Sequence, residues 1–340
     1  MKKTAFFSAS ALTLLSTQAL AVVNGTPIDW SSQDDTVRID SSISDSQYCT
    51  ATLIAGRYAI TAAHCLQGDK LDTVVTASND THTIAYSVLH PEYDNDGHSD
   101  DWDKDVAFAL LSQPIDYSHI HFLTARELTD NEPVHISGFG GTIENLNRAD
   151  FTFSHHHWAD PYLIYLDTVN LSHTTGGDSG SAWVNTNNEI VGIHKGSRTV
   201  MGERETYGTD LTYSDNFILE TVNGWHYPTL AQANGKTTIT VQSLHQDYTI
   251  DSAYTDGDAS LIVEESTCIN RDTGIAPFEQ CTYVIESEGG EGQLYLSNDE
   301  VITLNQPIAE SPSNEKSGAS FGLGSLLLTG LLAWRRKRSQ

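Results

Sequence analysis

The chain has 340 residues and a formal net charge of −27, because 45 acidic residues outweigh 18 lysines and arginines. Nucleic-acid binding needs a basic footprint, so this charge argues against nucleic acid as a partner. The length leaves room for two domains.

Residues 1–21 have the pattern of a secretory signal peptide. Lys2 and Lys3 precede a short apolar stretch, and Ala19-Leu20-Ala21 forms an Ala-x-Ala cleavage site. The apolar stretch is too short to favour a membrane span. We therefore expect the export machinery as a partner and a protein that is secreted or attached to the cell surface.

The next part of the chain has the pattern of short β-strands. Apolar and β-branched residues gather in four segments separated by Gly, Asn and Asp, namely 49–55, 58–61, 74–76 and 84–89. Short strands with such turns indicate an all-β sandwich or barrel.

Three motifs follow one another in the order His, Asp, Ser. His64 lies in Thr-Ala-Ala-His-Cys, Asp105 opens an apolar run, and Ser179 lies in Gly-Gly-Asp-Ser-Gly-Ser. A serine hydroxyl becomes a good nucleophile when a histidine takes its proton and a carboxylate holds that histidine. The order is that of chymotrypsin and differs from those of subtilisin and the α/β-hydrolases.

These motifs resemble those of the chymotrypsin-like (trypsin-fold) serine protease family, and the resemblance covers residues 22–227. It implies two six-stranded β-barrels with a catalytic cleft between them and protein or peptide substrates. By this resemblance His64 is the general base, Asp105 the orienting carboxylate and Ser179 the nucleophile. The amides of Gly177 and Ser179 would form the oxyanion hole. No cofactor is expected.

Val22-Val23-Asn24-Gly25 resembles the activated N-terminus of that family. The resemblance implies that a freed Val22 amino group pairs with Asp178, the residue before the nucleophile. Cleavage after Ala21 would then both export and activate the enzyme. The alternative is that Val22 only begins a strand.

The chain contains four cysteines, and an exported protein is expected to form disulfides. Cys49 and Cys65 have the spacing of the family's histidine-loop disulfide, which implies that they pair. Cys268 and Cys281 are then left as a local pair near the C-terminus.

The substrate pocket resembles that of the glutamyl endopeptidases. His173 occupies the position where trypsin-type enzymes carry Asp, and the surroundings of Thr174 and His194 are similar to the glutamyl branch. The resemblance implies that Thr174 and His194 bind a substrate carboxylate, and a nearby Lys195 could add positive potential. Asp178 departs from that branch, which has Asn. The alternative is that His194 points elsewhere and the specificity differs.

Two polar runs could suggest a metal ion. Five of the ten residues 94–103 are aspartates, and His155-His156-His157 are consecutive. The acidic spacing does not fit an EF-hand loop, and no residue can be named to orient the histidines. We therefore interpret both runs as solvated loops and expect no metal.

Beyond the protease region the sequence predicts a helix and then a second domain. The helix is expected over 213–222, with Asn223-Gly224 as its stop. Residues 237–308 are predicted to form a small β-sandwich accessory domain. Its predicted strands are 237–241, 248–250, 260–264, 281–285, 293–296 and 301–304. The domain could serve secretion, attachment or substrate choice, or only cap the protease.

The last residues form a polar linker, 309–318, and a hydrophobic segment with a basic end, 319–340. The segment resembles the sorting signal that a rhomboid-like protease (rhombosortase) processes in Gram-negative bacteria. It is expected to insert into the inner membrane before processing. A simple tail anchor is the alternative.

Together these patterns predict a secreted serine endopeptidase that forms an acyl-enzyme and prefers Glu before the cleaved bond. The alternatives are an endopeptidase of other specificity and a catalytically silent binding or adhesion protein with a protease fold.

Overall fold

The computed structural model describes residues 22–93, 103–269, 271 and 273–306. The predicted signal peptide, nearly all of the acidic run, the linker and the hydrophobic C-terminal segment lie outside these residues. No helix among the described residues is long and apolar enough to cross a membrane.

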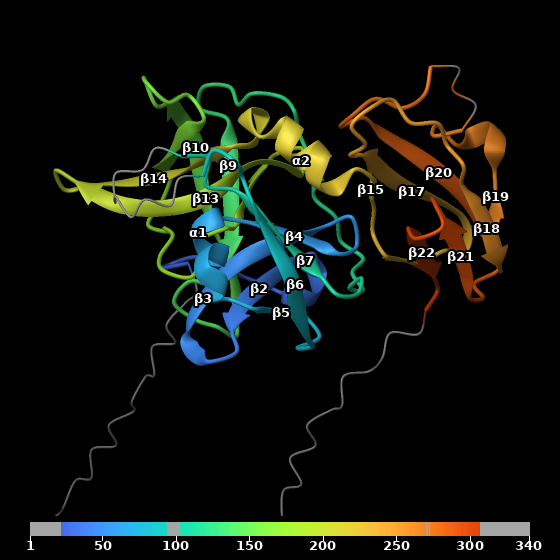
Figure 1. Ribbon diagram of the computed structural model, residues 1–340, viewed down its shortest axis with the longest axis horizontal. Coiled ribbons are helices and arrows are strands. Elements are labelled where there is room, and N and C mark those ends of the chain that lie inside the picture. The colour runs from blue at the N-terminus through green and yellow to red at the C-terminus, as the bar shows by residue number, and fades with distance from the viewer. Residues whose placement is uncertain (1–21, 94–102, 270, 272, 307–340) are drawn as a thin grey trace, which may run out of the picture. The chain divides into compact units, whose positions relative to one another are not determined.

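The first six-stranded unit is a closed antiparallel barrel (Figure 1). Buried and partly exposed residues alternate along its strand β2. There Val37 and Ile39 are fully buried while the residue after each is partly exposed, as expected for a strand with one face on a core. Around the barrel the strands follow the order β2 (Thr36–Ser41), β3 (Ser44–Ile54), β4 (Tyr58–Thr61), β7 (Ala107–Leu111), β6 (Thr81–Leu89) and β5 (Thr73–Val75).

The second barrel closes through the pairing of β9 with β10. Its core contains Trp183, Phe151 and Val22. The six strands of the ring are β9 (Pro133–Gly138), β10 (Leu146–His156), β11 (Leu163–Thr168), β14 (Glu203–Asp210), β13 (Glu189–Val200) and β12 (Ala182–Asn185). Two short strands join its sheet, β1 (Thr26–Ile28) on β10 and β8 (Phe122–Leu123) on β13. The expected double barrel is therefore present.

Helical segments are few and short. In the described ranges, the two α-helices are α1 (Ala63–Leu66) and α2 (Asp215–Val222), and the four 3-10 helices are η1 (Trp30–Gln33), η2 (Gln67–Asp69), η3 (Leu211–Tyr213) and η4 (Val263–Glu265). Helix α2 is capped at its C-terminus by Asn223, whose φ of 41° is left-handed. Asn tolerates that conformation, so the expected helix stop is present.

The C-terminal region contains two four-stranded sheets that share one hydrophobic core (Figure 1). One sheet has the order β15 (Trp225–His226), β17 (Gly235–Ser243), β20 (Gln280–Ser287) and β19 (Ser260–Leu261). The other has β16 (Leu230–Ala231), β22 (Val301–Leu304), β21 (Gly292–Tyr295) and β18 (Tyr254–Gly257). Strand pairing in this region thus begins at Trp225, upstream of residue 237.

Two predicted strands of this region are not formed as expected. Between 248 and 250 only Thr249 makes an isolated bridge, with Ile275, and Ile250 is 80% exposed. After Leu261 the chain turns into η4, where the Ser266 hydroxyl donates to the Ile262 carbonyl at 2.7 Å. Such local side-chain bonds compete with strand pairing.

Both disulfides are formed. Cys49 bonds to Cys65, and Cys268 bonds to Cys281. The first ties β3 to helix α1, which carries His64. The second ties the segment before β20 to the start of that strand.

Candidate active site

Strand pairing brings His64 and Asp105 together. His64 follows the end of β4 on helix α1, and Asp105 stands just before β7. These strands are antiparallel, and Thr61 pairs with Ala107. The end of one strand therefore lies beside the start of the other, and the two residues meet at one rim of the first barrel.

Asp105 holds His64 through two hydrogen bonds. One carboxylate oxygen accepts from the His64 amide at 2.9 Å, and the other lies 2.7 Å from Nδ1 of the ring. The Asp105 side chain is fully buried, whereas that of His64 is 37% exposed. Nδ1 donates to the carboxylate in the neutral ring, so Nε2 is left as an acceptor on the exposed imidazole.

The charge of Asp105 governs the protonation of His64. Burial lowers the pKa of His64, but the charge and hydrogen bond of Asp105 outweigh burial, so this pKa lies above its usual value. Burial likewise works to raise the pKa of Asp105, and the interactions with His64 bring it below the usual value instead. Asp105 therefore stays ionised and makes His64 a stronger base.

The loop with Ser179 is pressed against the strand that leads to His64. The Thr50 amide donates to the Ser179 carbonyl at 2.9 Å. At Gly180, which has a φ of +82°, a Cβ would lie 1.9 Å from the Thr61 hydroxyl. Only glycine fits this position, so the residue after Ser179 lies against Thr61, three residues before His64 in the sequence.

The loop also presents two amides that suit an oxyanion hole. The Gly177 carbonyl accepts from the Thr50 hydroxyl at 2.9 Å, and Gly177 has a φ of +102°. Among the described residues, neither the Gly177 amide nor the Ser179 amide donates a backbone hydrogen bond. Both remain available for an anionic oxygen.

Asp178 is buried directly behind this loop. Its carboxylate accepts from the amides of Gly140 at 2.7 Å and Thr175 at 2.8 Å. Burial nevertheless raises the pKa of Asp178 to about 7. The Val22 nitrogen donates to the Gly140 carbonyl at 2.7 Å, and the Val22 side chain is fully buried. Gly140 thus contacts both members of the predicted ion pair.

Thr174 and His194 are buried polar residues with unused hydrogen-bonding capacity. Their exposed fractions are 0% and 1%. Thr174 Oγ1 and His194 Nδ1 have no partner among the described residues. Burial lowers the pKa of His194 to about 3, so its ring is neutral near pH 7.

Arg204 was missed by sequence reasoning. It lies on β14 and pairs with Thr199 of β13. Its guanidinium donates to the Thr174 carbonyl and, at 3.0 Å, to the Ser197 hydroxyl. Arginine on a strand is unremarkable by sequence, and only the hairpin pairing places this charge beside Thr174.

Lys195 makes an ion pair that the sequence pattern does not predict. Its Nζ lies 2.7 Å from the Asp103 carboxylate, in a largely buried ion pair. The charge of Lys195 is therefore balanced by Asp103, although it also acts on His64 and Asp105.

Comparison with known proteins agrees with this geometry. The sequence profile of the trypsin family matches residues 22–218. The chain belongs to the trypsin family. Its fold is that of a trypsin-like serine protease, which implies protein or peptide substrates.

Solved structures that are similar to this chain include the following three. Neuropsin, a serine protease expressed in the limbic system of mouse brain, is 18% identical with a TM-score of 0.51, covering 58% of this chain and 98% of neuropsin. A mutant of human heparin binding protein is 16% identical with a TM-score of 0.51, covering 59% and 97%. The VesB protease of Vibrio cholerae is 16% identical with a TM-score of 0.47, covering 83% and 99%. Identities this low show the fold alone, so the activity must be argued from the site.

The histidine run 155–157 makes local contacts in this trypsin-family chain. The His155 ring stacks on Tyr165 with centroids 4.8 Å apart, and His156 Nδ1 lies 2.8 Å from the Pro161 carbonyl. His157 Nδ1 is 3.1 Å from the Asp160 carboxylate. Among the described residues, no metal-ligating cluster includes this run. Cys49, His64 and Cys65 do cluster, but both sulfurs are consumed by their disulfide.

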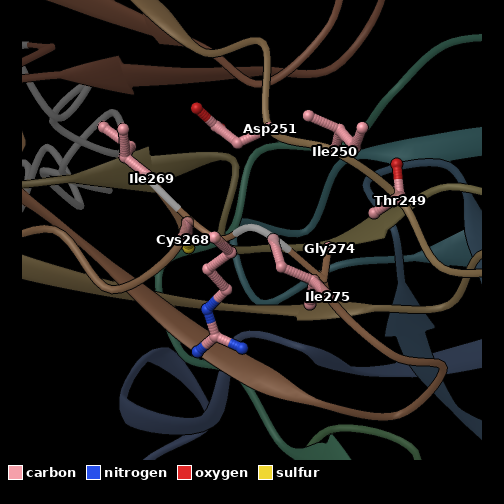
Figure 2. Close-up of a pocket in the computed structure, with 8 residues that line it drawn as sticks. Thr249, Ile250, Asp251, Cys268, Ile269, Gly274 and Ile275 are labelled. Atoms are coloured by element: carbon pink, nitrogen blue, oxygen red, sulfur yellow. The ribbon is translucent and has the colours of Figure 1, made fainter.

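The C-terminal region contains a cavity of about 300 Å³ (Figure 2). Its wall includes Ile250, Ile269 and Asp251, which are labelled in the figure. The Asp251 carboxylate accepts from the Tyr283 hydroxyl, and Arg271, also in the wall, pairs with Glu279. The charged groups of this cavity are thus engaged within the domain.

Proposed function

We propose that this chain is a serine endopeptidase in which Ser179 is the nucleophile, His64 the general base and Asp105 its orienting carboxylate. The observation that carries the proposal is the buried Asp105 carboxylate on His64, 2.7 Å from Nδ1. A buried carboxylate that raises the pKa of a partly exposed histidine suits that histidine to act as a general base.

The reaction proceeds by acyl transfer. His64 Nε2 takes the Ser179 proton as Oγ attacks the peptide carbonyl, and the charge on the carbonyl oxygen is stabilised by the amides of Gly177 and Ser179. Imidazolium then gives the proton to the leaving amine. Water enters, His64 removes its proton, and the acyl group is released from Ser179.

The pocket chemistry supports a preference for Glu before the cleaved bond. Thr174 and His194 offer unused polar atoms, and each can donate a hydrogen bond to a carboxylate. Neither carries a charge near pH 7, and Lys195 is balanced by Asp103. Arg204, bonded to the Thr174 carbonyl, supplies the positive charge that attracts a substrate carboxylate.

We further propose that the chain is exported and processed at both ends. Residues 1–21 are removed after Ala21, the freed Val22 amine pairs with Asp178, and segment 319–340 anchors the protein until it is cleaved. Two formed disulfides support an oxidising location, and the burial of Val22 beside Gly140 supports its role. Mass spectrometry of the mature protein tests this: intact residues 1–21 or an end at Gln340 would refute the corresponding cleavage.

Cleavage-site profiling on a complex peptide library tests the activity and the pocket. We expect cuts after Glu by the processed protein and none by Ser179→Ala. Arg204→Gln should weaken the Glu preference at least about tenfold in kcat/KM, since a charge-assisted contact contributes about 1.5–3 kcal/mol. Arg198→Gln, on the same hairpin but paired with exposed Glu205, is the matched control.

The outcomes separate the proposals. Cuts after another residue type, still dependent on Ser179, keep the protease and discard the Glu pocket. If the processed protein makes no cuts and a serine-directed covalent inhibitor does not label it, the protease proposal is wrong.

A further inference from the structure

Two histidines outside the triad face each other beside a buried carboxylate. His119 and His121 lie in the segment that joins the barrels, between β7 and β8, and Asp35 lies just before β2. The Nε2 atoms of the two rings are 3.4 Å apart, and a carboxylate oxygen of Asp35 completes a cluster within 4.8 Å. Asp35 is fully buried and His121 nearly so, while His119 is partly exposed.

The backbone around the cluster is fixed by two adjacent carboxylates. Asp34 accepts from the amides of Ser118 and His119 at 2.9 and 2.7 Å. Asp35 accepts from the His121 amide at 2.9 Å and lies 2.7 Å from Nδ1 of its ring. With Nδ1–H bound to Asp35, the lone pair of His121 points outward from Nε2.

Two nitrogen atoms lie near the single lone pair of His121 Nε2. The Gln33 side-chain nitrogen is 3.3 Å from His121 Nε2, and His119 Nε2 is 3.4 Å from it. Both distances exceed the 2.7–3.2 Å of ordinary N–H hydrogen bonds. Two nitrogens bound to one tetrahedral Zn²⁺ at about 2.0–2.1 Å lie about 3.3 Å apart. The separation therefore suits a shared cation better than a direct bond.

The surrounding charge also favours a cation. The Asp35 carboxylate is a fully buried acidic group, and one of its oxygens contacts both the amide and the ring of His121. Its second oxygen has no hydrogen-bond partner among the described residues. A carboxylate that holds one nitrogen of a histidine while the other binds metal is the common outer support of zinc sites.

We propose that His119 Nε2 and His121 Nε2 bind a borderline transition-metal cation of the Zn²⁺ type, with Asp35 orienting His121. The Gln33 carboxamide supplies an oxygen ligand after a half-turn of its amide, and water completes the tetrahedron. His226 takes no part, since its nitrogens contact the Ala55 amide and the His121 carbonyl.

The site would act as a structural clamp. A bound cation joins the segment between the barrels to η1 and to the start of β2, and none of the three triad residues belongs to it. Binding to the folded state alone raises stability with cation concentration. The expected effect is therefore on stability and on inter-barrel geometry rather than on the chemical step.

The test uses full-length Ser179→Ala protein, which cannot digest itself, with Zn²⁺ alone and Co²⁺ alone as probes. We expect one Zn²⁺ per chain by titration calorimetry, a Zn²⁺-dependent rise in Tm of several degrees, and the visible spectrum of tetrahedral Co²⁺. Asp35→Asn should weaken Zn²⁺ binding by about 10–100-fold. His119→Gln, at the partly exposed position, should abolish the Co²⁺ spectrum even if His121→Gln fails to fold.

Two controls locate the cation. His82→Gln, on β6, and replacement of His155, His156 and His157 by Gln should both retain binding. The proposal would be overturned if replacing His155, His156 and His157 abolished Zn²⁺ binding while His119→Gln retained it. Absence of stoichiometric binding by the parent protein would also overturn it. Neither result bears on the proposed protease activity, which is measured separately by peptide cleavage.

Discussion

At the scale of single residues, the basicity of His64 results from opposing neighbours. Burial lowers the pKa of His64, and Asp105 raises it more. Beyond Asp105, Lys195 lowers that pKa and Asp103 raises it, and these two residues form an ion pair with each other at 2.7 Å. Lys195 and Asp103 therefore act on the pKa of His64 in opposite directions and less strongly than Asp105.

We predict that Lys195→Gln shifts the acidic limb of the kcat/KM profile to higher pH. Removing a positive charge raises the pKa of His64, and the base must be neutral to accept the Ser179 proton, so activity at pH 6 should fall more than at pH 8. The profile is measured with a Glu peptide. Lys104→Gln, which removes the same charge from a pair with exposed Glu92, is the control. An unchanged limb would show that the ion pair only supports the fold.

The residues of the candidate site were predictable to the extent that they lie in local motifs. The patterns around His64, Asp105 and Ser179 place them by residue type and order. Arg204 was not predictable, because its proximity to Thr174 depends on the register of β13 with β14. By the sequence pattern Lys195 adds positive potential near the pocket, but the pattern does not predict its ion pair with Asp103, which is 92 residues away in sequence. Such long-range pairings leave no signal in a single sequence.

At the scale of elements, the loop that carries Ser179 and β4 are joined through a contact that only glycine permits. A Cβ at Gly180 would lie 1.9 Å from Thr61 Oγ1 and 2.3 Å from the Thr50 carbonyl. We predict that Gly180→Ala lowers stability by about 1–3 kcal/mol, the usual cost of such backbone strain, and displaces Ser179, so that kcat falls at least about a hundredfold.

Gly176→Ala is the matched control for this prediction, because nothing lies within 4 Å of its Cβ position. Thermal unfolding and steady-state kinetics of both variants, in the Ser179-containing protein, give the two readouts. Equal kcat values for the two variants would contradict the proposed role of the Gly180 contact.

Element prediction succeeded where apolar residues of a strand pack against a core. Residues 84–89 lie in β6, where Ile84 and Val88 are partly buried against the core, and 237–241 lie in β17. It failed at 248–250, where Ile250 is apolar yet 80% exposed and unpaired in any sheet. The closure of each barrel depends on pairing between distant strands, and the family resemblance supplied it where local pattern could not.

At the scale of the whole molecule, the first residue after the predicted signal peptide is connected to the loop that carries Ser179. Val22 is buried in the core of the second barrel and donates to Gly140, which in turn donates to Asp178. While Val22 is joined to Ala21, the Asp178 carboxylate accepts hydrogen bonds from backbone amides, but there is no free amine to form an ion pair with it. Export and catalytic competence are thus proposed to share one cleavage.

We predict that uncleaved protein loses stability as pH rises from about 4 to about 7. Burial raises the pKa of Asp178 from 3.8 to about 7, so in this window the unfolded chain has released its proton and the folded chain has not. Unfolding is then favoured by rising pH, by several kcal/mol at about 1.4 kcal/mol per pKa unit. After cleavage behind Ala21, the free energy of unfolding should instead rise with pH over this window, because the Val22 ammonium stabilises the ionised Asp178 carboxylate.

The comparison is made by urea unfolding between pH 4 and pH 8, on Ser179→Ala protein with residues 1–21 retained or removed. Asp178→Asn should flatten the pH dependence of the uncleaved form, since no proton is then exchanged at this position. It should also weaken the cleaved form near pH 8, where the ammonium loses its partner. Identical pH dependence in cleaved and uncleaved protein would mean that Val22 does not reach Asp178, and that the catalytic loop is set by Gly140 and Thr175 alone.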